Sequence, residues 1–350
     1  MTRSTLALLV VWGVALGACA ENASTSAGGS AGQPAGGDNS TGGQQATGGT
    51  GAVENVGGNG GAGANGGAGG NGGQAPTCEG LRPATGTTTH TLEWDGSSRS
   101  YSVHVPPSYS AATPLPVVFV FHGYTETASL IELISGMTPI AEDRGYIVVY
   151  AEGLFTSWNA GACCGSSGTL GVDDIGFVSA MLAEIESTYC IDPARIYASG
   201  FSNGGMLSHR IACEMSDTFA AVGAVSGTIA VADCTPSRPI AVSNFHGTAD
   251  LVVPYNGGFS GGASVPDTVA GWVARNGCTT TATTFDQGDA SCETHGGCDA
   301  GADVVLCTLE GGGHQWPGGL SAGPNGIINM DISASTALLD FFDQHPMPSP

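Results

Sequence analysis

Residues 195–205 read RIYASGFSNGG, in which a short β-branched and aromatic run leads into a serine framed by glycines. The run before the glycines has the composition of a buried strand, and helical periodicity follows them as far as Met215. The pattern Gly200-x-Ser202-x-Gly204 between a strand and a helix is typical of a nucleophile elbow, a turn so tight that it needs glycine. It predicts Ser202 as a nucleophile at the end of a strand, with an ordinary strand–helix turn as the alternative.

Strand and helix patterns alternate on both sides of this turn. Strands are predicted at 87–94, 99–105, 116–121, 146–150, 195–198, 221–225, 240–245 and 304–309. Helices are predicted at 129–144, 173–189, 205–215, 265–276 and 332–345. This alternation, without an internal repeat or a second core, predicts one α/β domain over residues 78–345. Together with the elbow it predicts the α/β-hydrolase fold, a mostly parallel sheet with helices on both faces.

A serine hydroxyl becomes an effective nucleophile only when a positioned base removes its proton. In the α/β-hydrolase fold an acid and then a histidine follow the serine along the chain. Asp250 comes just after the predicted strand 240–245, and His314 comes after the last predicted strand in the sequence GGGH. We therefore predict Asp250 as the acid that orients the base, and His314 as the base.

Other carboxylates and histidines are present in the same part of the chain. The alternatives are Asp233, Asp267 and Asp286 for the acid, and His246, His295 and His345 for the base. Asp173 and Asp174 precede the serine, so we predict that they are structural residues near the start of the following helix.

An oxyanion hole in this fold takes one backbone N–H from the residue after the nucleophile, which is Asn203. A second N–H is expected from the loop after strand 116–121, where the sequence reads His122-Gly123-Tyr124. Tyr124 is the first choice for this donor and Gly123 the second. A plain strand exit is the alternative interpretation of this loop.

The charged residues are strongly unbalanced, with eight arginines, no lysine and a formal net charge of −22. Such acidity argues against binding to nucleic acid and against electrostatic docking on anionic lipid. The absence of lysine excludes Schiff-base lysines, Ser–Lys dyads and lysine-dependent phosphate loops. The chemistry predicted above needs no metal and no organic cofactor.

Residues 1–19 have the features of an export signal, with Arg3 followed by an apolar run from Leu6 to Leu16. The run ends in LGAC, which resembles the lipobox of bacterial lipoproteins and implies a lipid on Cys19 as the only membrane attachment. An ordinary signal peptide is the alternative. Residues 20–77 form a predicted linker, because 21 of the 56 residues at 21–76 are glycine and large apolar side chains are nearly absent.

Ten cysteines remain when Cys19 is set aside. An even number of cysteines in an exported domain predicts up to five disulfides, although spacing alone does not give the pairing. A metal site at Cys292-x-x-His295-x-x-Cys298 is the alternative, but it lacks the paired spacing of a zinc ribbon.

Several motifs in order resemble the polyhydroxybutyrate-depolymerase-like esterase family, which includes feruloyl and acetylxylan esterases of the first carbohydrate esterase group. The motifs are FHG at 121–123, WNAGACCG at 158–165, VDDIGF at 172–177, GFSNGGM at 200–206, ACE at 212–214, HGTAD at 246–250 and GHQWP at 313–317. The resemblance covers about residues 78–345. It implies that Ser202, Asp250 and His314 are the catalytic triad, and that His122, Trp158 and Trp316 contact the substrate. For the tryptophans, packing in the core is the alternative role.

The resemblance implies an exported serine esterase, and feruloyl or acetyl esters on plant polysaccharide are the first expected substrates. Poly(3-hydroxybutyrate) or its oligomers are the second. A peptidase of the same fold and a non-catalytic surface-binding lipoprotein are the further alternatives. The sequence does not predict the oligomeric state.

Overall fold

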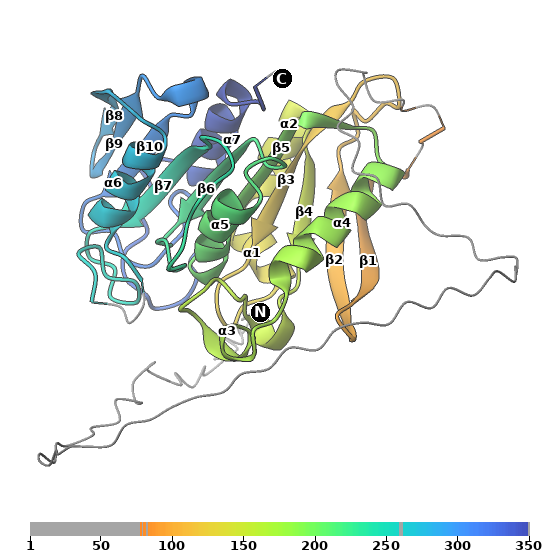
Figure 1. Ribbon diagram of the computed structural model, residues 1–350, viewed down its shortest axis with the longest axis horizontal. Helices are drawn as coiled ribbons and strands as arrows, with labels where there is room; N and C mark the ends of the chain where they lie inside the picture. Colours follow the sequence, from red (N-terminus) through yellow and green to blue (C-terminus); the bar gives the residue numbers. More distant parts are fainter. Residues whose placement is uncertain (1–77, 79, 82, 259–261, 349–350) are drawn as a thin grey trace, which may run out of the picture. The chain divides into compact units, whose positions relative to one another are not determined.

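The computed structural model describes residues 78, 80–81, 83–258 and 262–348 (Figure 1). The expected signal sequence, Cys19 and the linker 20–77 lie outside these residues. The strands are β1 (Gly86–Trp94), β2 (Ser97–Val105), β3 (Leu115–Phe121), β4 (Ile147–Ala151), β5 (Ile191–Phe201), β6 (Ala221–Val225), β7 (Ala241–Gly247), β8 (Thr280–Gln287), β9 (Ala290–Gly296) and β10 (Val304–Leu309). The helices are α1 (Ala128–Ser135), α2 (Met137–Arg144), α3 (Gly165–Leu170), α4 (Asp174–Thr188), α5 (Asn203–Glu214), α6 (Val265–Arg275) and α7 (Ala334–Gln344), with short 3-10 turns η1 (Leu154–Thr156) and η2 (Asp299–Gly301).

These strands form one sheet in the order β1-β2-β4-β3-β5-β6-β7-β10-β9-β8. The six central strands from β4 to β10 pair in parallel. The outer strands β1, β2, β8 and β9 pair with their neighbours in antiparallel fashion. Figure 1 shows helices covering this sheet. The predicted architecture, a mostly parallel sheet with helices around it, is therefore confirmed.

Strand β3 shows why the central strands are apolar at nearly every position. Phe119 and Phe121 belong to the core beneath α4, α5 and α6. Val118 and Val120 point to the opposite face and belong to the core beneath α1, α2 and α7. Since successive side chains of a strand alternate between the two faces of a sheet, a strand buried on both faces has no polar positions.

The structure differs from the sequence-based prediction in several places, one of which is the short helix α3, which was not predicted. The helix predicted at 129–144 divides at Gly136, whose φ of 56° ends α1 and starts α2. The hairpin of β8 and β9 was not predicted, because β8 is exposed at all but one of its positions and so shows no alternation of apolar and polar residues. No helix in the described ranges is both long and apolar enough to cross a membrane.

All ten cysteines of the described domain are paired, as the even number predicted. The disulfides are Cys78–Cys190, Cys163–Cys164, Cys213–Cys234, Cys278–Cys298 and Cys292–Cys307. Cys292 and Cys298 belong to different disulfides, so neither sulfur is free to hold a metal ion with His295.

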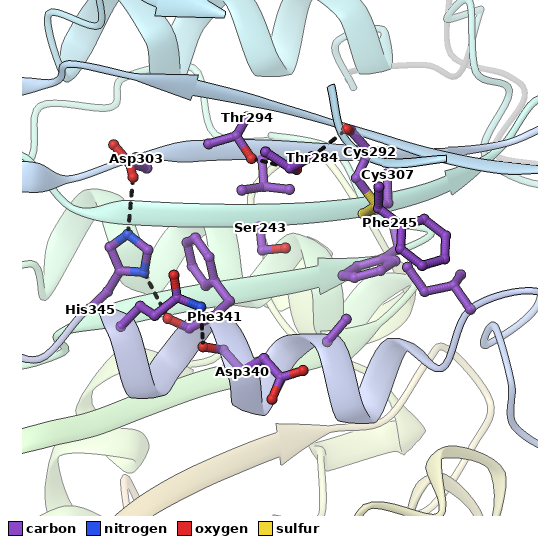
Figure 2. A pocket seen from close by; sticks show the side chains of 15 residues that line it. Ser243, Phe245, Thr284, Cys292, Thr294, Asp303, Cys307, Asp340, Phe341 and His345 are labelled. Carbon is purple, nitrogen blue, oxygen red and sulfur yellow. Dashed lines mark hydrogen bonds and ion pairs between the residues drawn. A yellow bond between two sulfur atoms is a disulfide. The ribbon is translucent and has the colours of Figure 1, made fainter. Parts of the chain in front are cut away.

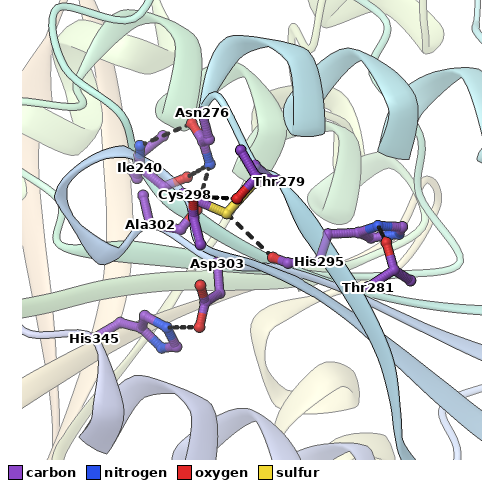
Figure 3. The surroundings of a disulfide bond; sticks show 11 residues. Ile240, Asn276, Thr279, Thr281, His295, Cys298, Ala302, Asp303 and His345 are labelled. Carbon is purple, nitrogen blue, oxygen red and sulfur yellow. Dashed lines mark hydrogen bonds and ion pairs between the residues drawn. A yellow bond between two sulfur atoms is a disulfide. The ribbon is translucent and has the colours of Figure 1, made fainter.

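The Cys278–Cys298 disulfide closes the open end of the β8–β9 hairpin (Figure 3). Next to it, the buried amide of Asn276 donates to the carbonyl oxygens of Ile240 and Ala302 at 2.8 Å each. The disulfide joins the two ends of the hairpin, and the amide attaches the end of α6 to the segments just before β7 and β10.

A cavity of about 280 Å³ lies between α7 and the face of strands β7, β8, β9 and β10 (Figure 2). Its lining includes Phe245, Phe285 and Phe341, with Asp303 and His345 nearby. None of the predicted triad residues lines it, so this cavity is separate from the candidate site described below.

We expect replacement of the hairpin disulfide, by Cys278→Ser together with Cys298→Ser, to lower the free energy of unfolding by about 2–5 kcal/mol. The reason is that the unfolded chain loses a cross-link. Urea denaturation of the two proteins measures the difference. Unchanged stability, or reactive thiols at the ten paired cysteines of the unreduced protein, would contradict the pairing.

Candidate active site

Ser202 occupies the sharp turn between β5 and α5. Its backbone has φ 53° and ψ −118°, a conformation that is rare for a residue with a side chain. The Ser202 N–H donates to the carbonyl oxygen of Val225 on β6 at 2.8 Å, which fixes the turn against the neighbouring strand. A Cβ atom at Gly200 would strike the backbone of Gly204, and one at Gly204 would strike the carbonyl oxygen of Phe121. The glycines of the predicted elbow are therefore required by close packing.

Asp250 lies in the loop after β7 with its carboxylate surrounded by donors. The N–H groups of Val252 and Val253 each donate to Oδ1 at 2.8 Å, and His314 Nδ1 lies 2.7 Å from Oδ2. Burial raises the pKa of Asp250, but hydrogen bonds from His246 and His314 outweigh it and hold the pKa well below its usual range. The carboxylate is thus ionised and able to orient the His314 ring.

His314 reaches Asp250 from a glycine loop after β10. The loop is fixed because the His314 N–H donates to the carbonyl oxygen of Asn325 at 2.7 Å. The His314 ring packs on the ring of Phe201, the residue before Ser202, with 4.8 Å between the centroids. The structure therefore brings Asp250 and His314 into contact and places the histidine beside the elbow.

The Ser202 hydroxyl makes no hydrogen bond to the His314 ring, although both residues are described. Such a bond is often long or misaligned before substrate binds. Ser202 is 8% exposed and His314 is 3% exposed. Both residues are thus buried rather than placed on an open surface.

Three of the alternative candidates contact other groups, whereas His246 contacts Asp250 itself: its Nε2 lies 3.4 Å from Asp250 Oδ2 and 2.8 Å from the Val253 carbonyl oxygen. Asp267 accepts a hydrogen bond from the Ser264 hydroxyl at the start of α6. His295 bonds to Thr281, and His345 lies 3.5 Å from Asp303. Asp173 accepts from the Gly176 N–H as the N-cap of α4, and Asp174 forms a buried ion pair with Arg99, so both have the predicted structural roles.

The two expected oxyanion donors are both free of other partners. The N–H groups of Asn203 and Tyr124 have no acceptor among the described residues. The N–H of Gly123, the second choice for this role, donates instead to Glu126 Oε2 at 2.8 Å. The geometry therefore favours Tyr124 over Gly123.

The expectation that His122, Trp158 and Trp316 contact the substrate needs correction. All three side chains are fully buried. The Trp158 indole N–H donates to the carbonyl oxygen of His122, and the Trp316 indole N–H donates to the Ser335 hydroxyl, at 3.0 Å each. Because their surfaces and polar atoms are already taken up by the protein, these residues support the site from within.

Five exposed apolar side chains, not predicted as functional, lie around the same edge of the sheet. They are Tyr124, Phe155, Leu251, Val252 and Ile327, which we call the apolar rim. Leu251 and Val252 directly follow Asp250, and the carbonyl oxygen of Ile327 accepts from the residue before His314. Phe155 precedes Thr156, whose carbonyl oxygen accepts from the Thr125 N–H beside Tyr124. Their loops have no periodic pattern, so only the fold could bring them together.

Comparison with known proteins identifies the family of the chain. A family model described as esterase PHB depolymerase matches residues 99–242. The putative esterase NocK of Nocardia uniformis subsp. tsuyamanensis is 31% identical over 292 residues, covering 74% of this chain and 84% of that protein. The chain therefore belongs to this family of esterases and is a carboxylic ester hydrolase, as the sequence motifs predicted.

Two further proteins illustrate the range of similarity. Feruloyl esterase B of Piromyces equi is 35% identical over 233 residues, which are 62% of this chain but only 42% of that protein. The solved structure of an acetyl xylan esterase from Aspergillus awamori has a TM-score of 0.54 at 16% identity and covers 73% of this chain and 99% of its own. The second likeness supports the α/β-hydrolase fold.

We expect Ser202→Ala to abolish ester hydrolysis while leaving thermal unfolding nearly unchanged, because the hydroxyl serves chemistry rather than packing. Turnover of a soluble aryl ester and a thermal melt measure the two effects. Residual activity above about a thousandth of the native rate would indicate another nucleophile, since loss of a triad member usually costs more than that.

Proposed function

We propose that this esterase cleaves feruloyl or acetyl esters on plant polysaccharide by a Ser202–His314–Asp250 mechanism. The hydrogen bond of 2.7 Å between His314 Nδ1 and Asp250 Oδ2, next to a strained glycine-framed serine, is the observation that carries the catalytic part. No other described histidine and carboxylate of the chain combine this order with a position beside the elbow.

The chemistry follows from the placement of these groups. With Nδ1 held by Asp250, the other ring nitrogen of His314 takes the proton from Ser202 as its oxygen attacks the ester carbonyl. The Asn203 and Tyr124 N–H groups stabilise the oxyanion, and each such donor is worth roughly a factor of 10²–10³ in rate. His314 then protonates the leaving alcohol. Water releases the acyl group in a second displacement of the same kind.

The apolar rim supports an ester with an apolar acyl group. Leu251 is 90% exposed and Ile327 is 71% exposed, so both side chains are available to contact an apolar acyl group. An aromatic feruloyl group would cover part of this surface, whereas an acetyl group would cover little of it. Relatives named feruloyl esterase and acetylxylan esterase/xylanase support the same substrate class.

Hydroxyalkanoate oligomers are the second candidate substrate. The description of the matching family model names a polyester depolymerase, and the aliphatic side chains of the rim would suit an aliphatic polyester. A protein that only binds such a surface is the alternative from another class. Failure of a fluorophosphonate probe to label Ser202 would favour that alternative.

A substrate screen separates the ester classes. We expect purified protein to hydrolyse methyl ferulate at least about tenfold faster, by kcat/KM, than it hydrolyses 3-hydroxybutyrate oligomers, and Leu251→Ser to narrow that ratio. A tenfold difference in kcat/KM corresponds to about 1.4 kcal/mol in the transition state. Preference for the oligomers would instead select the second candidate. A matched aryl amide serves as the test for peptidase activity.

The location of the protein is a further proposal. Disulfides persist in oxidising compartments, so the five pairs support a site of action outside the cytoplasm. We expect Cys19→Ser to move the protein from the membrane fraction to the soluble fraction, or to block its processing, as shown by fractionation and immunoblotting. A Cys19→Ser protein that still sediments with membranes would contradict the lipid anchor.

A further inference from the structure

The loop that carries the Tyr124 N–H is held in an unusually constrained conformation. Gly123 to Glu126 form a turn closed by a hydrogen bond of 3.2 Å from the Glu126 N–H to the Gly123 carbonyl oxygen. Thr125 has φ 64°, which is strained for a β-branched residue. Its N–H donates to Thr156 at 2.8 Å. Such strain persists only where neighbouring groups hold the backbone in place.

Almost every polar group of the two peptides that flank Gly123 is bonded to the protein. In the first peptide, the His122 carbonyl oxygen accepts from the Trp158 indole, and the Gly123 N–H donates to Glu126. In the second, the Gly123 carbonyl oxygen accepts from His122 Nδ1 at 2.7 Å. Only the Tyr124 N–H is left without an acceptor among the described residues.

The state of the His122 ring follows from its two bonds. The Gly153 N–H donates to Nε2 at 3.0 Å, so Nε2 carries no proton and Nδ1 must be the donor to Gly123. Burial lowers the pKa of His122 to about 4, and the ring therefore stays neutral in this form. Because the peptide is planar and trans, a carbonyl fixed toward His122 directs the Tyr124 N–H to the opposite side.

We propose that Glu126 is a positioning residue for the oxyanion hole: its carboxylate holds the His122–Gly123 peptide, and this anchors the adjoining Gly123–Tyr124 peptide that carries the Tyr124 N–H. The inference rests on the proposed function, because it concerns the same site. Glu126 does not touch the substrate in this role. Gly123 lies between the Glu126 carboxylate and the ring of Phe201, the residue before Ser202. A Cβ atom at Gly123 would lie 2.9 Å from Glu126 Oε2 and 3.2 Å from that ring.

Glu126 also makes the hole sensitive to pH. Burial raises the pKa of Glu126 to about 7, and the hydrogen bond from the Gly123 N–H offsets part of the rise. Above that pH the carboxylate is charged and accepts strongly. Below it the group is neutral and accepts more weakly, because hydrogen bonds to charged acceptors are about twice as strong. The hydrogen bond from the Gly123 N–H to Glu126 is therefore strongest above pH 7 and weakens as the pH falls.

Three variants of the full-length protein test the proposal. Glu126→Ala removes the acceptor, Glu126→Gln keeps an uncharged one, and Thr127→Ala is the matched control. Thr127 caps α1 by accepting from the Leu130 N–H at 3.2 Å and makes no bond to Gly123. The measurements are kcat and KM on a soluble aryl ester, with a thermal melt of each variant.

For Glu126→Ala we expect kcat to fall by roughly 10–100-fold with KM within about twofold, since the oxyanion forms only in the transition state. Glu126→Gln should recover most of kcat. Thr127→Ala should melt at a lower temperature with an unchanged kcat. The proposal would be overturned if Glu126→Ala kept the kcat of the native protein. It would also be overturned if Glu126→Gln lost as much kcat as Glu126→Ala.

The pH profile provides a readout that a purely structural role would not change. The ratio of native to Glu126→Gln kcat should rise as the pH increases through about 7, because only the native side chain titrates there. The other titratable groups in and around the turn are His122, Tyr124, Glu152 and His314, and both proteins contain them. A flat ratio would overturn the pH-dependent part. Labelling of Ser202 by a fluorophosphonate tests the proposed function separately, so the two failures are distinguishable.

Discussion

The left-handed backbone angle of Ser202 is the constraint on which the candidate site depends. A residue with a side chain adopts φ 53° only when its surroundings leave no alternative. Here the Ser202 N–H is bonded to β6, and the helix α5 packs so closely on β3 and β5 that only glycine fits at positions 200 and 204. The packed centre of the sheet therefore determines where the serine oxygen lies, and the loops of the site are built around that point.

The residue after the nucleophile connects the elbow to the interior. The Asn203 side chain accepts from the Trp158 N–H at 2.7 Å and donates to the Trp158 carbonyl oxygen at 3.1 Å, which fixes this loop to α5. The next N–H of the loop, at Asn159, donates to Asp174, whose other oxygen binds Arg99 at 2.7 Å. Loss of one partner of such a buried pair leaves an uncompensated charge and costs about 3–5 kcal/mol. The position of the elbow is thus linked to a charge pair in the core.

The sequence predicted the parts of the molecule that follow a local rule. Ser202, Asp250 and His314 each follow a buried strand, and a parallel sheet brings the ends of its strands to one edge. By contrast, the substrate contacts of His122 and Trp158 were inferred from a family resemblance, and a shared motif does not tell a side chain that faces substrate from one that holds a peptide in place. The exposed β8 hairpin and the apolar rim follow no periodicity. Both features depend on contacts between distant parts of the chain, which local sequence patterns do not reveal.

The two carboxylates near Ser202 differ because of the groups that face each. Two histidines face Asp250, and the hydrogen bonds from His246 and His314 outweigh its burial and hold its pKa well below the usual range. Glu126 receives one N–H, from Gly123, which offsets burial only in part, so its pKa rises to about 7. Each hydrogen bond to a carboxylate favours its charged form. The two histidines beside Asp250, where Glu126 has a single backbone donor, therefore separate a carboxylate charged at neutral pH, suited to orienting His314, from one that titrates near neutral pH.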